Sequence, residues 1–366
     1  MDRTAANLCE AGRVLTGGSW FAVVIADSRS MTDLRPRIAV TMGDPAGVGP
    51  ELCVRMLNHA ALAEACVPIV FGDAGVLRRA AAHLGLALTA PVVAPADWNQ
   101  ACATIAHPTV LDFGLLDAAT VVPGRVAAPC GAAAFRFISA ALDAGLAGQI
   151  EAVSTGPINK EALHAAGHHY PGHTEIFAER LQTAKWCMML TSAEITCSLV
   201  TAHVGYHEVP GLLSVERIVD VIELTAAALR RMRGREPRLI ICGLNPHAGE
   251  QGLFGAREEE RFILPAVAAA RAQGIAIEGP LPPDTAFLPQ RRAATDAYVC
   301  MYHDQGLIPL KALAFDSAIN TTLGLPLVRT SVDHGTAFDI AWQGKANPNS
   351  LYEAILLAAR LAPRRG

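Results

Sequence analysis

The sequence lacks three features that would place it in common classes of protein. No apolar run approaches the roughly 20 residues that a transmembrane helix needs. None of the nine cysteines forms a C-x-x-C pair, a usage typical of a reducing cytoplasm rather than of a disulfide framework. Basic residues are not in excess, because 30 Lys and Arg stand against 34 Asp and Glu. We therefore expect a cytoplasmic protein that binds neither nucleic acid nor a membrane surface.

The usual glycine-rich nucleotide motifs are also missing from the place where they belong. The β-prone run 37–42 leads into GDPAGVGPE, and an apolar helix follows. This order is not G-x-G-x-x-G, and it is not a P-loop, because no Lys-Ser/Thr pair follows. Pro50 suits the first turn of a helix, whose free N–H groups favour anions. The stretch is therefore either a ligand-binding turn or a glycine-rich turn with no ligand.

What is present is an alternation of apolar strands and helical stretches, which predicts an α/β fold with a mostly parallel sheet. Hydrophobic residues make up 51% of the 366 residues, enough for a substantial core in two domains or one large one. Strands are expected at 37–42, 67–71, 109–113, 150–154, 188–190, 197–201, 239–242 and 298–302. Helices are expected at 52–58, 74–84, 130–147, 213–231, 257–273 and 350–361, with a rigid loop at 279–285.

The first 36 residues look like an extension rather than part of this fold. Only Arg3 and Arg13 precede the short apolar stretch FAVVIA, so a secretory signal is not expected. We expect residues 1–36 to be a disordered extension that activity does not require, with Met31 as an alternative start.

Side chains able to bind an anion gather between residues 298 and 340. His303 stands where the strand at the start of this segment should end, and ligands of open α/β sheets bind beyond the carboxyl ends of strands. Lys311, Asn320 and Arg329 follow in an otherwise apolar segment. A guanidinium fork and an ammonium charge suit a small ligand with a carboxylate or phosphate. Each residue taken singly could be a surface or strand-end residue, and it is the combination that favours a site.

Three histidines share one context, since His203, His247 and His303 each follow an apolar strand. Parallel strands bring such ends together from distant parts of a chain. Three neutral imidazoles suit Zn²⁺ and related ions and leave a coordination position open for substrate. The spacing is not a local ligand motif such as H-E-x-x-H, so by itself it leaves the metal site as one alternative among several.

Eight longer motifs are spread from Arg37 to the C-terminal helix: TMGDPAGVGPE, TGPINKEAL, PGHTE, LNPHAGE, GPLPPDT, YHDQGLIPLK, INTTLGLP and RTSVDHGTA. Together they resemble the 4-hydroxythreonine-4-phosphate dehydrogenase family of vitamin B6 biosynthesis. A sister group, the dehydrogenases of D-threonate or D-erythronate 4-phosphate, is resembled almost as closely through NKEALHAAGHHYPGHTE and LFGAREEE. Ala202 and Trp342 depart from residues common in these families, which leaves the geometry of their loops open.

The resemblance implies a role for particular residues. It implies one divalent metal ion per site, Zn, Mg or Co, held by His203, His247 and His303. It implies substrate contacts from His173, Thr174, Lys311, Asn320 and Arg329, although the first two could equally be capping residues of a helix. Lys160 and Asp304 are candidates for proton transfer or for orienting other groups.

The resemblance also implies an architecture and a reaction. The fold would be similar to isocitrate and isopropylmalate dehydrogenases, with a cleft between two α/β/α subdomains, 37–150 plus about 310–366 and about 151–309. The second would carry a homodimer interface with the site. The reaction would be NAD- or NADP-dependent oxidation of 4-phosphohydroxy-L-threonine to a β-keto acid that decarboxylates to 3-amino-2-oxopropyl phosphate. The alternatives are sugar-acid phosphate oxidation and a non-catalytic metal- and anion-binding protein.

Overall fold

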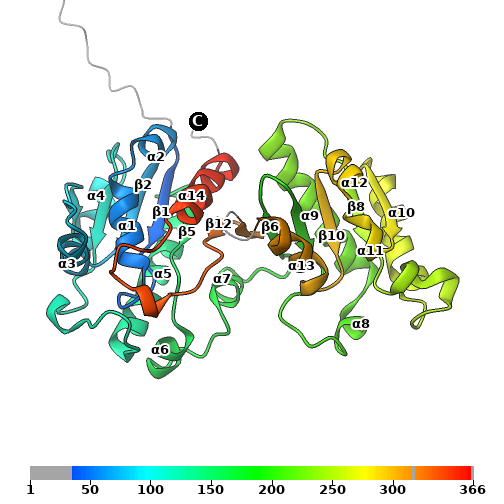
Figure 1. The fold of residues 1–366 in the computed structure, drawn as a ribbon. Coiled ribbons are helices and arrows are strands. Elements are labelled where there is room, and N and C mark those ends of the chain that lie inside the picture. The colour runs from blue at the N-terminus through cyan, green and yellow to red at the C-terminus, as the bar shows by residue number, and fades with distance from the viewer. Residues whose placement is uncertain (1–34, 315–317, 364–366) are drawn as a thin grey trace, which may run out of the picture. The chain divides into compact units, whose positions relative to one another are not determined.

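One mixed sheet runs through the part of the chain that this computed structural model describes, residues 35–314 and 318–363 (Figure 1). Its strands follow the order β3-β4-β2-β1-β5-β12-β11-β6-β7-β10-β8-β9. They are β1 (Arg37–Thr41), β2 (Val67–Gly72), β3 (Val92–Val93), β4 (Thr109–Asp112), β5 (Ala152–Thr155), β6 (Cys187–Thr191), β7 (Thr196–Leu199), β8 (Leu239–Cys242), β9 (Ile277–Leu281), β10 (Ala297–Cys300), β11 (Ile319–Leu323) and β12 (Val328–Ser331).

The sheet consists of two parallel parts joined by antiparallel strands. The strands from β3 to β12 pair in parallel, and so do the strands from β7 to β9. Between them, β11 pairs antiparallel with β12 and with β6, and β6 pairs antiparallel with β7. Within each parallel part the carboxyl ends of neighbouring strands therefore lie along one edge, where loops can build a site.

The α-helices connect and cover these strands. They are α1 (Gly49–Leu57), α2 (Ala60–Ala65), α3 (Ala74–Leu84), α4 (Trp98–Ala101), α5 (Ala128–Leu146), α6 (Lys160–Ala165), α7 (His173–Arg180), α8 (Val209–Leu212), α9 (Val215–Arg233), α10 (Leu264–Ala272), α11 (Pro283–Ala286), α12 (Pro289–Ala294), α13 (His303–Ala314) and α14 (Asn349–Leu361). In the first parallel part, α5 packs on β2, β1 and β5, and α14 packs on β12, β5 and β1.

The second parallel part shows why helices cover both faces of the sheet. Side chains alternate between the faces of a strand, and in β10 both sets are apolar. Ala297 and Val299 join the core formed with α9 and α10, whereas Tyr298 and Cys300 join the core under α13. The side chains of the first parallel part form a core of their own.

Local sequence signals fix the ends of the best-defined helices. The Asp73 side chain accepts a hydrogen bond from the Val76 N–H at the start of α3, and Gly85 ends that helix in the left-handed region. The Ser214 side chain accepts from the Arg217 N–H at the start of α9, and Gly234 ends it in the same way. The helix predicted at 74–84 is therefore confirmed at both ends.

The structure confirms the α/β class and the mostly parallel sheet, and it corrects one segment. The predicted rigid loop at 279–285 is wrong, because β9 and α11 occupy these residues. Strands β11 and β12 and helix α13 were not predicted. The predicted extension 1–36 lies, apart from its last two residues, outside the part of the chain that is described. The assignment of residues to two subdomains stays a prediction.

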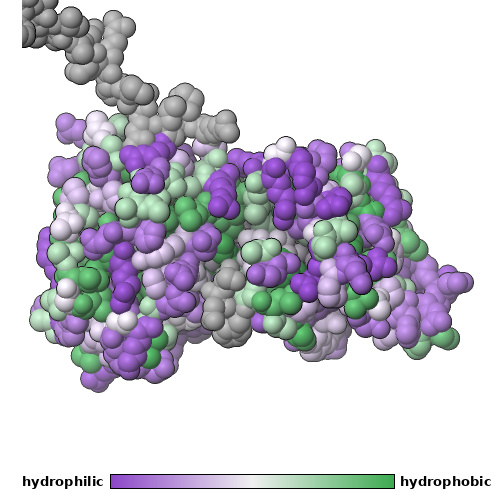
Figure 2. Space-filling view, turned by 45° about the horizontal axis from the view of Figure 1, so that its top comes forward, coloured by the Kyte–Doolittle hydropathy of each residue, from purple (hydrophilic) through white to green (hydrophobic). Residues whose placement is uncertain are grey.

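The helices, the surface and the cysteines bear on whether the protein has membrane-spanning segments, apolar patches or disulfides. No described helix is both long enough and apolar enough to cross a lipid bilayer. On the face drawn in Figure 2, hydrophobic residues lie in scattered patches between hydrophilic ones, as is usual for globular proteins. The eight cysteines within the described residues are all free and buried.

Candidate active site

Two of the predicted metal-binding histidines lie side by side because their strands do. Strands β7 and β10 pair in parallel, and the pairing continues beyond both, where the Thr201 N–H donates to the Met301 carbonyl at 3.1 Å. His203 and His303 each follow this pair by two residues, and their ring centroids lie 5.5 Å apart. The side chain of His203 is 58% exposed and that of His303 is 34% exposed, so both rings are open to a ligand.

The neighbours of His303 hold its ring in one orientation. Its Nδ1 lies 2.7 Å from Oδ1 of Asp304, and the Tyr206 hydroxyl donates to the other carboxylate oxygen. These hydrogen bonds, Tyr206 first and His303 second, hold the pKa of Asp304 below its usual value. A carboxylate that accepts from Nδ1–H leaves Nε2 free to bind a metal ion, an arrangement common around metal-binding histidines. Asp304 is therefore placed to orient His303.

Gln305 ties the ends of two neighbouring strands together behind the histidines. Its Oε1 accepts from the Met301 N–H at 2.6 Å, and its Nε2 donates to the Gly243 carbonyl at 2.7 Å. Met301 follows β10 and Gly243 follows β8, so one buried amide fixes the point at which both loops leave the sheet.

His247 lies on an unusual turn after β8. Six successive residues, 247 to 252, have positive φ, so the segment Pro246–Gly252 winds in a left-handed sense that L-residues adopt only at a cost. The buried Glu259 holds the base of this turn, because its Oε1 accepts from the N–H groups of Leu244 at 2.9 Å and Asn245 at 2.8 Å. Glu259 also opens a π-helical turn, a feature frequent at functional sites.

The described residues fit a metal ion in part. His203 and His303 provide two neighbouring imidazoles, one of them oriented by Asp304. Within residues 35–314 and 318–363, however, no three His, Cys, Asp or Glu side chains converge on a single point, so His247 does not complete the set within one chain. The predicted three-histidine site stays a prediction.

Arg329 is the least expected feature of the site. It is only 2% exposed, and it has no carboxylate at ion-pair distance among the described residues. Its guanidinium donates to the hydroxyls of Thr322 at 3.1 Å, Thr155 at 3.0 Å and Thr174 at 3.4 Å, and it lies over the ring of Phe177. Burial lowers its pKa to about 10, which keeps it charged at neutral pH. A buried cation without a counter-ion is costly unless a ligand provides the negative charge.

Helix α7 joins the histidine pair to Arg329. His173 and Thr174 open the helix, and the next residue, Glu175, lies 3.9 Å from Nδ1 of His203. The pKa of Glu175 is lowered, chiefly by the neighbouring imidazole of His203. The predicted substrate residues His173, Thr174 and Arg329 therefore lie in one region with His203.

The protonation state of His173 follows from its surroundings. Its Nε2 lies 3.1 Å from the Gly156 carbonyl oxygen, which only accepts, so Nε2 carries the hydrogen. Burial lowers the pKa of His173 to about 3, with repulsion from Arg329 and Lys160 adding to the effect. The ring is therefore neutral at physiological pH, and its Nδ1 is a hydrogen-bond acceptor.

The remaining predicted residues have different surroundings. Asn320 lies in β11 on the same face as Thr322, and its buried Oδ1 has no hydrogen-bond partner among the described residues. Lys311 forms an ion pair with Asp333, just beyond the end of β12. Lys160 opens α6 and is exposed. These contacts do not test the predicted roles of the three residues, so substrate binding by Asn320 and Lys311 and proton transfer or orientation by Lys160 stay predictions.

The glycine-rich turn is explained by close backbone packing. A Cβ at Gly43 would come within 2.3 Å of the Pro157 carbonyl oxygen, and one at Gly49 within 2.0 Å of the Met42 carbonyl oxygen. The same turn buries Asp44, whose Oδ2 has no hydrogen-bond partner among the described residues. Burial raises the pKa of Asp44 to about 6. A ligand at this turn is not required to account for the glycines.

Sequence reasoning missed the supporting residues. Thr155, Glu175, Tyr206 and Glu259 are ordinary residues in their segments, and only tertiary contacts give them a place at the site.

Comparison with known proteins agrees with this arrangement. A 4-hydroxythreonine-4-phosphate dehydrogenase from Desulforapulum autotrophicum is 44% identical over 339 residues, which cover 92% of this chain and 98% of that one. A D-threonate 4-phosphate dehydrogenase from Cupriavidus necator is 43% identical over 336 residues, 92% of this chain and 100% of that one. The crystal structure of 4-hydroxythreonine-4-phosphate dehydrogenase from Klebsiella pneumoniae, 45% identical, superposes with a TM-score of 0.77 and covers 90% of this chain and 100% of that one.

These similarities define the chain as an α/β enzyme, an oxidoreductase of the dehydrogenase type. The family model described as pyridoxal phosphate biosynthetic protein PdxA matches residues 64–358, and the chain belongs to that family. The resemblance drawn from the motifs is thereby confirmed.

Proposed function

We propose that this chain oxidises a phosphorylated hydroxy acid, with NAD or NADP as the hydride acceptor and one divalent metal ion, Zn, Mg or Co, per site. The substrate we favour is 4-phosphohydroxy-L-threonine, whose oxidation gives a β-keto acid that loses CO₂ to form 3-amino-2-oxopropyl phosphate. The relatives fall into two groups, named 4-hydroxythreonine-4-phosphate dehydrogenases and D-threonate 4-phosphate dehydrogenases, and both names support a phosphorylated hydroxy acid as the substrate class.

The observation that carries the proposal is the buried guanidinium of Arg329. Three hydroxyls and an aromatic ring surround it, and among the described residues no carboxylate lies at ion-pair distance, although the charge of Glu175 acts on it from farther away. A phosphate or carboxylate group of the substrate would accept two parallel N–H bonds from it. Asn320, with an unpartnered Oδ1 on the neighbouring strand, would provide a further polar contact to the same ligand.

His173 would position the substrate through its free nitrogen. Because its Nε2–H is engaged with the Gly156 carbonyl, the neutral ring presents Nδ1 as an acceptor. Such an acceptor can receive the proton of a substrate hydroxyl in a hydrogen bond and so orient that group beside His203. Thr174 would add a hydroxyl contact, and Lys311 a positive charge once its pairing with Asp333 is exchanged for the ligand.

His203 and His303 would hold the metal ion, with Asp304 orienting His303. A bound divalent ion lowers the pKa of an alcohol that coordinates it and stabilises negative charge on a neighbouring oxygen. We propose that His247 of the partner subunit completes the set in a homodimer. Exposed apolar side chains on the loops and helix that carry the three histidines support an interface there, namely Tyr206, Leu253 and Ile308, each more than 60% exposed.

Steady-state kinetics would test the proposal. NAD or NADP reduction would be followed with 4-phosphohydroxy-L-threonine, D-threonate 4-phosphate and D-erythronate 4-phosphate, before and after chelation and after metal is restored. We expect the highest kcat/KM with the first compound and loss of turnover on chelation. Preference for a sugar-acid phosphate would favour catabolism instead. No reduction with any of the three would favour a non-catalytic metal- and anion-binding protein.

A further inference from the structure

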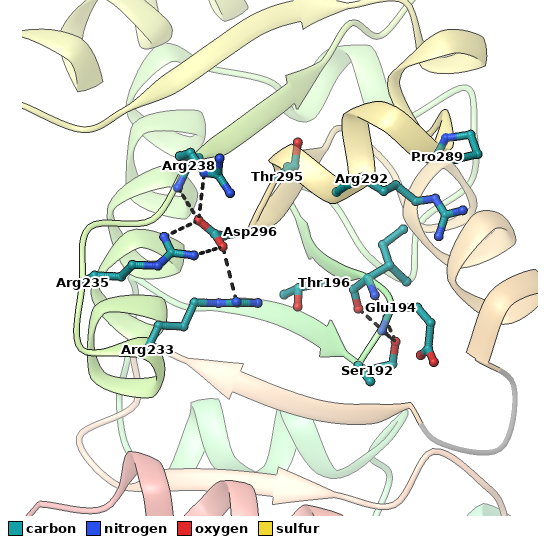
Figure 3. A pocket seen from close by; sticks show the side chains of 13 residues that line it. Ser192, Glu194, Thr196, Arg233, Arg235, Arg238, Pro289, Arg292, Thr295 and Asp296 are labelled. Carbon is teal, nitrogen blue, oxygen red and sulfur yellow. Dashed lines mark hydrogen bonds and ion pairs between the residues drawn. The ribbon is translucent and has the colours of Figure 1, made fainter.

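An arginine-lined cavity lies at the opposite ends of the strands that carry the histidines. The cavity has a volume of about 450 Å³, and its lining comes from the turn after α9, the β6–β7 hairpin and α12 (Figure 3). Thr196 begins β7, Asp296 precedes β10 and Arg238 precedes β8, so the cavity borders the amino ends of these parallel strands. His203, His303 and His247 follow the carboxyl ends, which makes this cavity separate from the candidate active site.

Asp296 organises the arginines on one side of the cavity. Its carboxylate is 3% exposed and accepts both guanidinium N–H groups of Arg235, at 2.7 and 2.8 Å. It also accepts the Arg238 backbone N–H at 2.8 Å and lies 3.3 Å from Nη1 of Arg233. The Nε of Arg238 lies 3.7 Å from the same carboxylate, so a single negative charge is shared among three arginines. The side chains of Arg233 and Arg238 stay 41% and 57% exposed.

The charge around the cavity is not balanced. Four arginines line it, and only two carboxylates do, those of Asp296 and Glu194, which leaves two surplus positive charges. Arg233 at the end of α9 is explained in part by the helix dipole, which favours cations there. That reason does not extend to Arg292 on the far side, whose Nε donates to the Phe287 carbonyl and which has no ion pair among the described residues.

The geometry points to a second anion-binding site, which takes a small phosphorylated molecule with at least two negative charges. Guanidinium forks match phosphate oxygens, and a phosphate monoester carries about −1.5 to −2 at neutral pH, which meets the surplus of two. The volume exceeds that of a phosphate group alone and lies within the range of small-ligand sites, so the cavity has room for the rest of such a molecule. The inference goes beyond the proposed reaction and does not depend on it.

Calorimetric titration of the full chain with inorganic pyrophosphate tests the inference. Arg329→Ala serves as the background, so that the candidate active site does not contribute binding. In this background we expect one saturable site that weakens as salt is raised. Adding Arg233→Gln with Arg292→Gln should weaken binding at least tenfold. The matched control, Arg231→Gln with Arg291→Gln, removes the same charge from α9 and α12 outside the cavity and should change binding less than twofold.

The outcomes distinguish binding of the anion in the cavity from general attraction of the anion to the positive charge of the surface. Absence of saturable binding in the Arg329→Ala background would overturn the inference. An equal loss in the two double variants would do so too, since it would show that net charge alone attracts the anion. Binding of an acidic peptide without binding of pyrophosphate would assign the arginines to a protein partner instead. Thermal unfolding of each variant, the Arg329→Ala background included, checks that the substitutions leave the fold intact.

Discussion

The imidazole rings of His203 and His303 lie 5.5 Å apart, although 100 positions separate them in the sequence. The reason is the register of the sheet, since each follows by two residues a backbone hydrogen bond between Thr201 and Met301. In the proposed shared metal site, these two rings form one chain's half, and within the described residues no third His, Cys, Asp or Glu completes a group with them. The proposed interface site would therefore take two histidines from one subunit and one from its partner, which can be tested.

Mixing inactive variants should reveal which histidines act together. If His203 and His303 come from one subunit and His247 from its partner, a heterodimer of His203→Ala and His247→Ala keeps one intact site. We expect dissociation and remixing to restore activity and about one metal ion per heterodimer. A mixture of His203→Ala with His303→Ala is the matched control and should regain neither, because every site then lacks one ligand. Restoration in the control mixture would contradict this assignment.

Replacing Arg329 should weaken the substrate and not the dinucleotide. Arg329→Ala removes a charge-assisted contact worth about 1.5–3 kcal/mol, which corresponds to a rise of about 10- to 150-fold in the substrate's KM. Arg329→Lys keeps the charge but loses the fork and should be intermediate. Kinetics with the substrate and direct binding of the dinucleotide separate the two effects. If dinucleotide affinity falls while the substrate's is kept, the assignment of Arg329 is wrong.

Glu259 should matter for metal binding although it is not a proposed ligand. Glu259→Gln keeps the size of the side chain and an oxygen for the N–H groups of Leu244 and Asn245, but its NH₂ group replaces the oxygen that accepts from Nδ2 of Asn245 at 3.0 Å. The turn that carries His247 would then lose its support, and we expect metal affinity to fall about 10- to 100-fold. Metal titration of the folded protein measures this. Glu260→Gln, the neighbouring substitution, should leave affinity unchanged, and an equal loss in both variants would argue against a specific support.

The buried charge of Asp44 should make the protein less stable at neutral pH than a neutral side chain at the same position would. Its folded-state pKa is about 6, above the ordinary 3.8, because burial disfavours the charge. Below about pH 4 the Asp44 carboxyl therefore does not lower the free energy of unfolding. The loss in this free energy grows as the pH rises from 4 to 6. Asp44→Asn keeps the acceptor for the Ala46 N–H and should raise the free energy of unfolding by about 1–3 kcal/mol at pH 8.

Denaturant unfolding at a series of pH values measures this difference. The gain in free energy of unfolding from Asp44→Asn should shrink to nothing near pH 4, because the side chain at position 44 is then neutral in the folded state of both proteins. Asp97→Asn, an exposed position, should give no gain at either pH. A gain that does not depend on pH would show that the charge of Asp44 is not its cause.

The sequence by itself determined the class of fold and much of the candidate site. Short continuous apolar runs predicted the strands and the helical stretches between them predicted the helices, because both are local properties of the chain. The same runs placed His203, His247 and His303 after strands. The longer motifs indicated the family, and residues such as Arg329 and His173 were named before their contacts were known.

Tertiary structure alone decided which of these features meet. Strand order depends on pairing between distant segments, so the neighbourhood of β7, β10 and β8 could not be read from any one of them. The first part of the loop predicted at 279–285 belongs to strand β9, which lies at the edge of the sheet, where Pro280 needs no partner for an N–H it lacks. The solitary charge of Arg329 and the arginine cavity around Asp296 also arise only on folding, because burial and charge balance are properties of the packed chain.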